Sequence, residues 1–172
     1  RQLSKIYHHY TYRFLFLPET IGSISYLSEN FEKMKKNTIA GWVLTCIGDK
    51  GPFSYIPSRL GNNYADRIAK EVLGIQVPEF ITYSWLDRGS DERQYCSPGI
   101  DLPVCSITRS KYDTYPEYHT HLDDLELVSQ ESLEKSLEVL SHLVKKIESQ
   151  RVPKSILLCE PQMGRRNLYS NI

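Results

Sequence analysis

Short runs of aliphatic and aromatic residues predict the strands of this protein. The run at residues 10–17 is aromatic and aliphatic and is stopped by Pro18. Further strands are expected at residues 38–47, 53–56, 79–85 and 102–108. The run at 38–47 is continuously apolar, as expected of a central strand that is covered on both faces, whereas 53–56 is predicted to be a short edge strand.

Between these runs, apolar residues recur every three or four positions, which predicts helices with one buried face. The first helix is expected from Thr20 to Lys36. A second begins at an Asn62 cap and ends at Gly74, and a third begins at Ser129 and ends before Pro153. The predicted buried positions of the three helices are Ile24, Leu27, Phe31 and Met34; Ala65, Ile68, Ala69 and Val72; and Leu133, Leu137, Leu140, Val144 and Ile147.

The alternation of strands and helices predicts the fold class. We expect an α/β three-layer sandwich, with a mostly parallel or mixed central sheet and helices on both faces. Residues 1–151 form the expected domain. The chain has no initiator Met and opens on what reads as the end of a helix, so we expect the N-terminal part of this domain to be missing. Residues 152–172 are loop-like and mildly basic, and we expect a tail that leads into a further module.

Charge and cysteine usage limit the classes of partner and the cellular compartment that we expect for this protein. Twenty-one basic residues balance twenty-one acidic ones, so no net field recruits nucleic acid or an anionic membrane. No apolar run could span a bilayer, and the first residues lack the apolar core of a secretory signal. Four scattered cysteines without a Cys-x-x-Cys pair suit a reducing compartment, so we expect a cytoplasmic protein.

Ionisable residues gather where the predicted strands end, which is where open α/β folds bind ligands. Glu19 lies at such a junction between a strand and a helix. Its functional interpretation is a general base that activates a metal-bound water. The alternative is an ordinary acidic residue at a helix start, where the dipole effect is worth only ~0.5 kcal/mol.

Candidate metal ligands follow two other strand ends. Asp49, after Gly48, is either a metal ligand or a turn-forming residue. His119 and His121, with two aspartates close by, form either a ligand cluster or a histidine-rich surface loop. Imidazole and carboxylate together suit zinc better than magnesium or calcium. The sequence has no Gly-x-Ser-x-Gly, nucleotide-phosphate or His-Glu-x-x-His motif, so metal-assisted hydrolysis is the favoured chemistry.

Four motifs in this order resemble the co-catalytic zinc aminopeptidases over nearly the whole chain. They are Pro18-Glu19-Thr20-Ile21-Gly22-Ser23, Gly48-Asp49, Gly89-Ser90-Asp91-Glu92-Arg93 and Tyr118-His119-Thr120-x-x-Asp123. More narrowly, the third and fourth motifs and the tail that begins Glu160-Pro161-Gln162 resemble a bacterial subfamily of aminopeptidase-like proteins, often linked to polysaccharide biosynthesis. Members of that subfamily carry a winged-helix-like module after the tail, which this chain would lack.

The resemblance implies a hydrolase that cleaves an N-terminal amide or a small peptide or aminoacyl substrate. Asp49 would bind one zinc ion and His119 the other, while Glu19 would pass a proton from the bridging water to the leaving amine. The implied substrate side is lined by Asp91, Glu92 and Arg93, and one tyrosine among Tyr112, Tyr115 and Tyr118 would stabilise the oxyanion.

The sequence departs from the family pattern in two places. The family's first histidine and its bridging aspartate come from a segment upstream of residue 1, and Thr20 stands where the family has a second glutamate ligand. We therefore expect residues 1–172 alone to be inactive. The competing hypothesis is a catalytically inactive domain that binds a peptide or a sugar-linked ligand, and a third is an interaction scaffold. The number of zinc ions and oligomer formation stay open.

Overall fold

The computed structural model describes residues 8–150, 156, 158 and 162–169. Its central element is a four-stranded mixed sheet with the order β1-β4-β2-β3. The strands are β1 (Gly41–Leu44), β2 (Ser54–Ile56), β3 (Ile81–Thr82) and β4 (Val104–Thr108). β1 pairs with β4 in parallel and β2 with β3 in parallel, while β2 and β4 are antiparallel. All five residues of β4 are buried, so β4 is the centre of the sheet.

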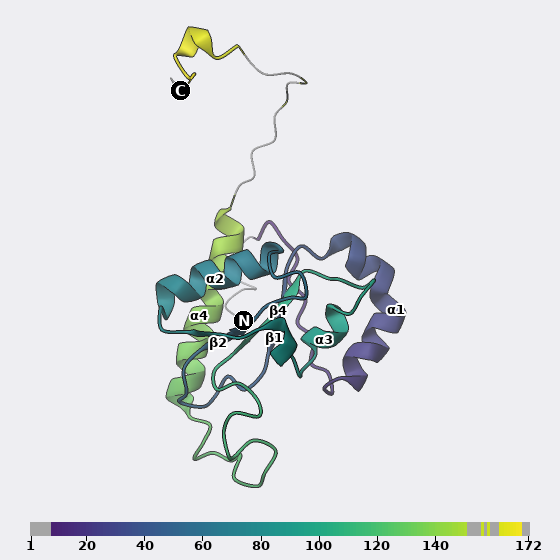
Figure 1. Ribbon diagram of the computed structural model, residues 1–172, viewed down its shortest axis with the longest axis vertical. Coiled ribbons are helices and arrows are strands. Elements are labelled where there is room, and N and C mark those ends of the chain that lie inside the picture. The colour runs from purple at the N-terminus through teal and green to yellow at the C-terminus, as the bar shows by residue number, and fades with distance from the viewer. Residues whose placement is uncertain (1–7, 151–155, 157, 159–161, 170–172) are drawn as a thin grey trace.

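Helices cover both faces of this sheet, which confirms the predicted three-layer α/β sandwich. Figure 1 shows α2 (Tyr64–Gln76) and α4 (Gln130–Ser149) on one side of the strands, and α1 (Ile21–Asn37) and the short α3 (Glu92–Tyr95) on the other. Alternate residues of β4 serve the two layers. Cys105 and Ile107 pack with α2 and α4, whereas Val104 packs with α1 and α3.

The helix starts follow local sequence signals. Asn63 caps α2 in a capping box with Asp66, one residue after the predicted cap. Ser129 caps α4 as predicted. Asp66 is itself buried and accepts hydrogen bonds from the Tyr55 hydroxyl (2.6 Å) and from the backbone N–H and hydroxyl of Ser58 (2.9 and 2.5 Å). Burial, followed by the hydrogen bond to Asp66, raises the pKa of Tyr55.

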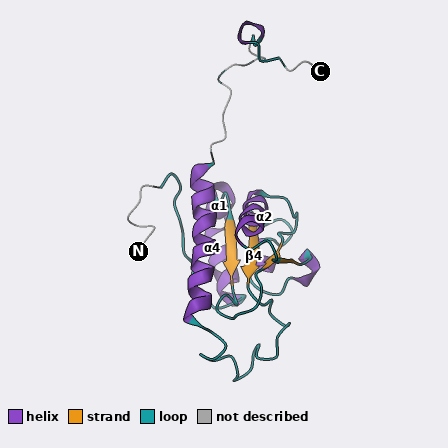
Figure 2. Ribbon diagram, turned by 90° about the vertical axis from the view of Figure 1, so that its left-hand side faces the viewer, coloured by secondary structure: helices purple, strands orange, loops and turns teal. Residues whose placement is uncertain are grey.

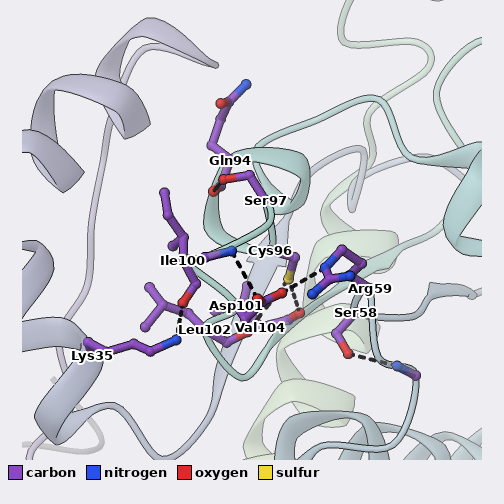
Figure 3. Close-up of polar contacts among 12 residues, drawn as sticks. Lys35, Ser58, Arg59, Gln94, Cys96, Ser97, Ile100, Asp101, Leu102 and Val104 are labelled. Atoms are coloured by element: carbon purple, nitrogen blue, oxygen red, sulfur yellow. Dashed lines mark hydrogen bonds and ion pairs between the residues drawn. The ribbon is translucent and has the colours of Figure 1, made fainter.

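The C-terminal end of α3 is anchored to its neighbours by side chains that Figure 3 draws. Arg59 pairs with Asp101 at 2.7 Å, which ties the loop after β2 to the turn after α3. Lys35 of α1 donates to the carbonyl of Ile100 at 2.5 Å. The thiol of Cys96 donates to the carbonyl of Val104 at 3.0 Å. These contacts fix α3 between α1 and the start of β4.

Three predicted strands differ from the structure. Residues 10–17 form no strand: in the described part of the chain this extended segment has no ladder partner, and Phe14 and Phe16 are 67% and 92% exposed. An apolar sequence is compatible with a strand, but a neighbouring backbone has to complete it. The run at 53–56 is not an edge strand, because β2 lies between β4 and β3. The run at 38–47 is not a central strand, because β1 lies at one edge of the described sheet and Leu44 is 45% exposed.

The predicted buried face of α4 is also wrong in its register. The buried residues are Ser132, Ser136, Val139, Leu143 and Ile147, while Leu133 and Leu137 are 43% and 56% exposed. The small Ser136 lets α4 approach the end of β1, where its hydroxyl donates to the carbonyl of Ile47 at 2.7 Å. Figure 2 shows α4 lying alongside the strands. Gly74 does not end α2, which continues to Gln76.

Among the described residues, no helix is long and apolar enough to cross a membrane. The predicted tail at 152–172 falls largely outside the described residues; the described part includes a 3-10 turn, η3 (Gly164–Arg166).

Candidate functional site

A cleft of about 480 Å³ lies where β1 ends, and residues of the loop between β4 and α4 also line it. Its lining includes five of the residues predicted from the sequence, namely Glu19, Asp49, Asp91, Tyr118 and His119. Parallel pairing of β1 with β4 brings the carboxyl ends of these two strands to the same edge of the sheet. The structure therefore brings these five residues together at one cleft, and the catalytic and metal-binding roles expected of them stay predictions.

Asp49 sits at the base of this cleft with one carboxylate oxygen bound and the other bare. The residue is 4% exposed. Its Oδ1 accepts from the backbone N–H of Gly51 and from the hydroxyl of Ser110, both at 2.6 Å. Its Oδ2 is buried and has no hydrogen-bond partner among the residues that the structure describes. A buried oxygen of a carboxylate is costly without a partner, so Oδ2 is available to a ligand.

Two glycines allow this arrangement. A Cβ on Gly51 would lie 1.9 Å from the Ser110 Oγ and 2.7 Å from Asp49 Oδ1, so only glycine permits the hydrogen bonds at Oδ1. A Cβ on Gly48 would lie 2.7 Å from Val128 Cγ1, in the loop that closes over the cleft. Close backbone approach, not only turn geometry, therefore explains why glycine flanks Asp49.

Glu19 lies at the turn that precedes α1 and is held by the Gly89–Arg93 segment. The hydroxyl of Ser90 donates to Glu19 Oε1 at 2.5 Å. The next residue, Thr20, has a left-handed backbone (φ 62°), and its N–H donates to Asp91 Oδ1 at 2.7 Å. Such a conformation is costly for a β-branched residue, so the Asp91 contact stabilises a turn that the backbone alone disfavours.

His119 and two tyrosines also line the cleft. His119 has φ 58° and stacks on the ring of Tyr118, with centroids 4.0 Å apart and 16° between the planes. The hydroxyl of Tyr115 donates to Cys46 Sγ at 3.4 Å. Burial raises the pKa values of Tyr115 and Tyr118, so both phenols stay neutral donors near pH 7.

Three predicted substrate-side residues do not line the cleft. Glu92 is fully buried beneath the Gly89–Asp91 turn, and the Tyr112 hydroxyl donates to it at 2.8 Å. Arg93 instead donates to the Thr20 hydroxyl at 3.2 Å. Sequence reasoning grouped these residues with Asp91 because they are adjacent, but successive residues at a helix start point in different directions.

Two residues of the cleft, Ser90 and Cys46, were not predicted from the sequence to belong to the site; Ser90 is the partner of Glu19. Ser90 lies inside the motif that carries the family resemblance, so a signal for it existed. Cys46 has φ 46° and ends the apolar run after β1, and nothing in that run distinguishes it. Ser110 follows the predicted strand at 102–108, and its contact with Asp49 joins residues 61 positions apart.

The donors on this chain fit part of a metal site. Asp49 offers its bare Oδ2, and His119 offers an imidazole on the same cleft. Among the described residues, no group of three or more His, Cys, Asp or Glu side chains is placed to hold a metal ion. A catalytic zinc takes three protein ligands and water, so these residues form an incomplete set.

Comparison with known proteins identifies relatives of greater length. A "Putative polysaccharide biosynthesis protein with aminopeptidase-like domain" of Clostridium acetobutylicum is 41% identical to this chain; the match covers 100% of this chain and 39% of that protein. The crystal structure of a "putative peptidase" from Clostridium acetobutylicum matches with a TM-score of 0.82 and 41% identity, over 96% of this chain and 39% of the other. This chain thus spans about two fifths of the length of these relatives.

The likeness extends to a protein family. The profile of the family described as "Domain of unknown function (DUF4910)" matches residues 1–150, which include every residue placed at the cleft above. The solved structure that matches this chain is the clostridial one named a putative peptidase. The family match ends at residue 150, directly after the last residue of α4. The chain therefore belongs to the DUF4910 family, with an α/β fold similar to that of the clostridial peptidase-like protein.

Proposed function

We propose that this chain contributes part of the active site of a zinc-dependent, aminopeptidase-like hydrolase. The observation that carries the proposal is the bare, buried Oδ2 of Asp49 in a cleft shared with Glu19 and His119. The names of the clostridial relatives support a peptidase-like activity. The proposed substrate is a peptide or a small aminoacyl compound with a free α-amino group, in a polysaccharide-biosynthesis context and in the cytoplasm.

Each cleft residue has a proposed role in this reaction. Asp49 and His119 each supply one metal ligand. Bound zinc would lower the pKa of its water and polarise the scissile carbonyl. Glu19 accepts a proton from the attacking water and transfers it to the leaving amine. Asp91 lies on the substrate side of the cleft, and the neutral hydroxyls of Tyr115 and Tyr118 are the candidates for hydrogen bonding the oxyanion.

Metal content of the full-length protein tests the ligand assignment. Asp49→Asn keeps an acceptor for Gly51 and Ser110 but removes the charge, and His119→Ala removes the imidazole. We expect both to lower the zinc content per molecule by elemental analysis. The matched controls are Asp113→Asn and His121→Ala, which change exposed residues outside the cleft. If the zinc content is unchanged in the Asp49 and His119 variants, or falls equally in the controls, the metal assignment is wrong.

Thr20 supports an alternative, a catalytically inactive domain that binds a peptide or sugar-linked ligand. Its hydroxyl accepts a hydrogen bond from Arg93, and the described residues hold no complete ligand set. Replacing Glu19 by Gln separates the two functions in the full-length protein. A hydrolase loses turnover of aminoacyl substrates and keeps substrate binding, whereas a binding domain has no turnover to lose.

A further inference from the structure

Glu92 is a fully buried carboxylate that accepts four hydrogen bonds. Its Oε1 accepts from the backbone N–H groups of Gly89 (2.8 Å) and Ser90 (3.1 Å) and from the Tyr112 hydroxyl (2.8 Å). Its Oε2 accepts from the hydroxyl of Ser106 on β4 at 2.8 Å. A buried carboxylate is retained only when its oxygens are satisfied, so this network ties the 89–91 turn to the central strand.

The packing of Gly89 and Tyr112 around Glu92 allows this hydrogen-bond network to form. A Cβ on Gly89 would lie 2.5 Å from Cε2 of Tyr112, so glycine at this position lets the Tyr112 ring close over the turn. Burial, followed by the charge of Glu92, raises the pKa of Tyr112. A phenol that keeps its proton is a permanent donor to the Glu92 carboxylate.

The 89–91 turn, which Glu92 holds, also contacts Glu19 and Thr20. Ser90 is 2% exposed, and its hydroxyl binds Glu19 Oε1, while Asp91 binds the N–H of Thr20. The other oxygen of Glu19, Oε2, has no donor among the described residues. One carboxylate oxygen is thus oriented and the other is open to accept a proton.

We propose that Glu92 is a positioning residue, which aligns the general base Glu19 through Ser90 and Asp91 and does not contact the substrate. The inference rests on the proposed function, because Glu19 is the base only in that reaction. It assigns Glu92 and Tyr112 to the support of the cleft, and it makes Ser90 the link between the sheet and the proposed base.

Amide hydrogen exchange on residues 1–172 tests whether Glu92 holds the 89–91 turn, and it requires no catalytic activity. Glu92→Met keeps the length of the side chain but gives the N–H groups of Gly89 and Ser90 no acceptor. Glu92→Gln keeps an amide oxygen for them, and the Ser106 hydroxyl can reverse to accept from its NH2. We expect Glu92→Met to speed exchange at Ser90 and Thr20 by roughly tenfold, a value typical of one lost hydrogen bond, and Glu92→Gln to have a smaller effect.

The amides of Ala69 and Leu73, buried in α2, report on the whole fold. In Glu92→Met their exchange should be accelerated less than that of Ser90 and Thr20. Unaltered exchange at Thr20 would overturn the proposal. Equal acceleration at Thr20 and in α2 would also overturn it, since Glu92 would then support the entire domain and not this turn.

Turnover by the full-length protein tests the link to Glu19. Ser90→Ala and Glu92→Met should each lower kcat by roughly tenfold to a hundredfold, as for a misplaced catalytic group, and leave KM nearly unchanged. Because both act through one contact, the double variant should be no slower than the slower single variant. Ser28→Ala and Glu126→Gln, exposed changes of the same types, serve as controls.

The outcomes separate the two proposals. Multiplicative losses in the double variant would overturn the positioning role of Glu92. Turnover that survives Glu19→Gln would remove the proposed function, while the exchange result for the 89–91 turn would stand on its own.

Discussion

The hydroxyl of Ser110 donates to Oδ1 of Asp49, and Oδ2 of the same carboxylate is buried without a partner in the described part of the chain. The side chain is therefore oriented before any ligand arrives. Gly51 contributes the second donor to Oδ1, and it can approach only because it has no Cβ. This local packing makes the cleft sensitive to small changes in volume.

Gly51→Ala should destabilise the domain by about 1–3 kcal/mol, the usual cost of overpacking. The new methyl group would meet the Ser110 Oγ and Asp49 Oδ1. Urea unfolding of residues 1–172, followed by circular dichroism, measures the change. Ser110→Gly in the same chain should restore part of the loss, because it removes one of the two clashing groups. Full stability of Gly51→Ala alone would contradict the packing described here.

Gly74→Ala should have the opposite effect. This glycine lies within α2 and has open space where a Cβ would be placed. Alanine is favoured over glycine inside a helix by about 0.8–1.0 kcal/mol. The same urea titration should show a higher midpoint with an unchanged slope. A lower midpoint would mean that α2 ends near Gly74, as the sequence pattern predicted.

Asp66→Ala should destabilise the domain by about 2–4 kcal/mol, since it leaves several buried donors without an acceptor. Those donors are the Tyr55 hydroxyl and the N–H and hydroxyl of Ser58. Thermal unfolding measures the loss. Combining Asp66→Ala with Tyr55→Phe should cost less than the sum of the two single changes, because the second change removes one orphaned donor. Strict additivity would show that the two side chains do not interact.

Thiol labelling should distinguish Cys46 from Cys96 and Cys105. Cys46 is partly exposed in the cleft, whereas the other two are buried, and burial raises the pKa of Cys96 to about 11. In a Cys159→Ser background, iodoacetamide at pH 8 should modify Cys46 first, as read by peptide mass spectrometry. In the full-length protein, a ligand that fills the cleft should slow this labelling. Faster modification of Cys96 would contradict the burial described for α3.

The ion pair between Arg59 and Asp101 should contribute fully to stability only above the pH at which an unfolded aspartate ionises. The hydrogen bond from Arg59 lowers the pKa of Asp101 in the folded state. The contribution is therefore present above the unfolded-state pKa of about 3.9 and is lost as the pH falls through the lowered folded value. The difference in unfolding free energy between wild type and Asp101→Asn should shrink as the pH drops from about 6 towards about 2. A constant difference would exclude the ion pair as its source.

The alternation of apolar periods in the sequence was sufficient to predict the layered α/β fold, the extents of α1 and β4, and the Ser129 cap. These features depend on local signals, because a helix face, a strand run and a capping side chain each involve residues close in the chain. The same locality pointed to Glu19, Asp49 and His119, which follow strand-like runs or precede a helix.

Tertiary structure decided the features that depend on a neighbour. Residues 10–17 have a strand-like sequence, yet a ladder needs a second backbone, and β2 is internal only because β3 pairs beside it. The register of α4 was set by Ser136 against the end of β1, and not by the leucines with helical spacing. The contacts Ser90–Glu19 and Ser110–Asp49 join residues 71 and 61 positions apart, so no local pattern could reveal them. For the same reason only the fold could place Glu92 beneath the site, because neighbours in sequence at a helix start point in different directions.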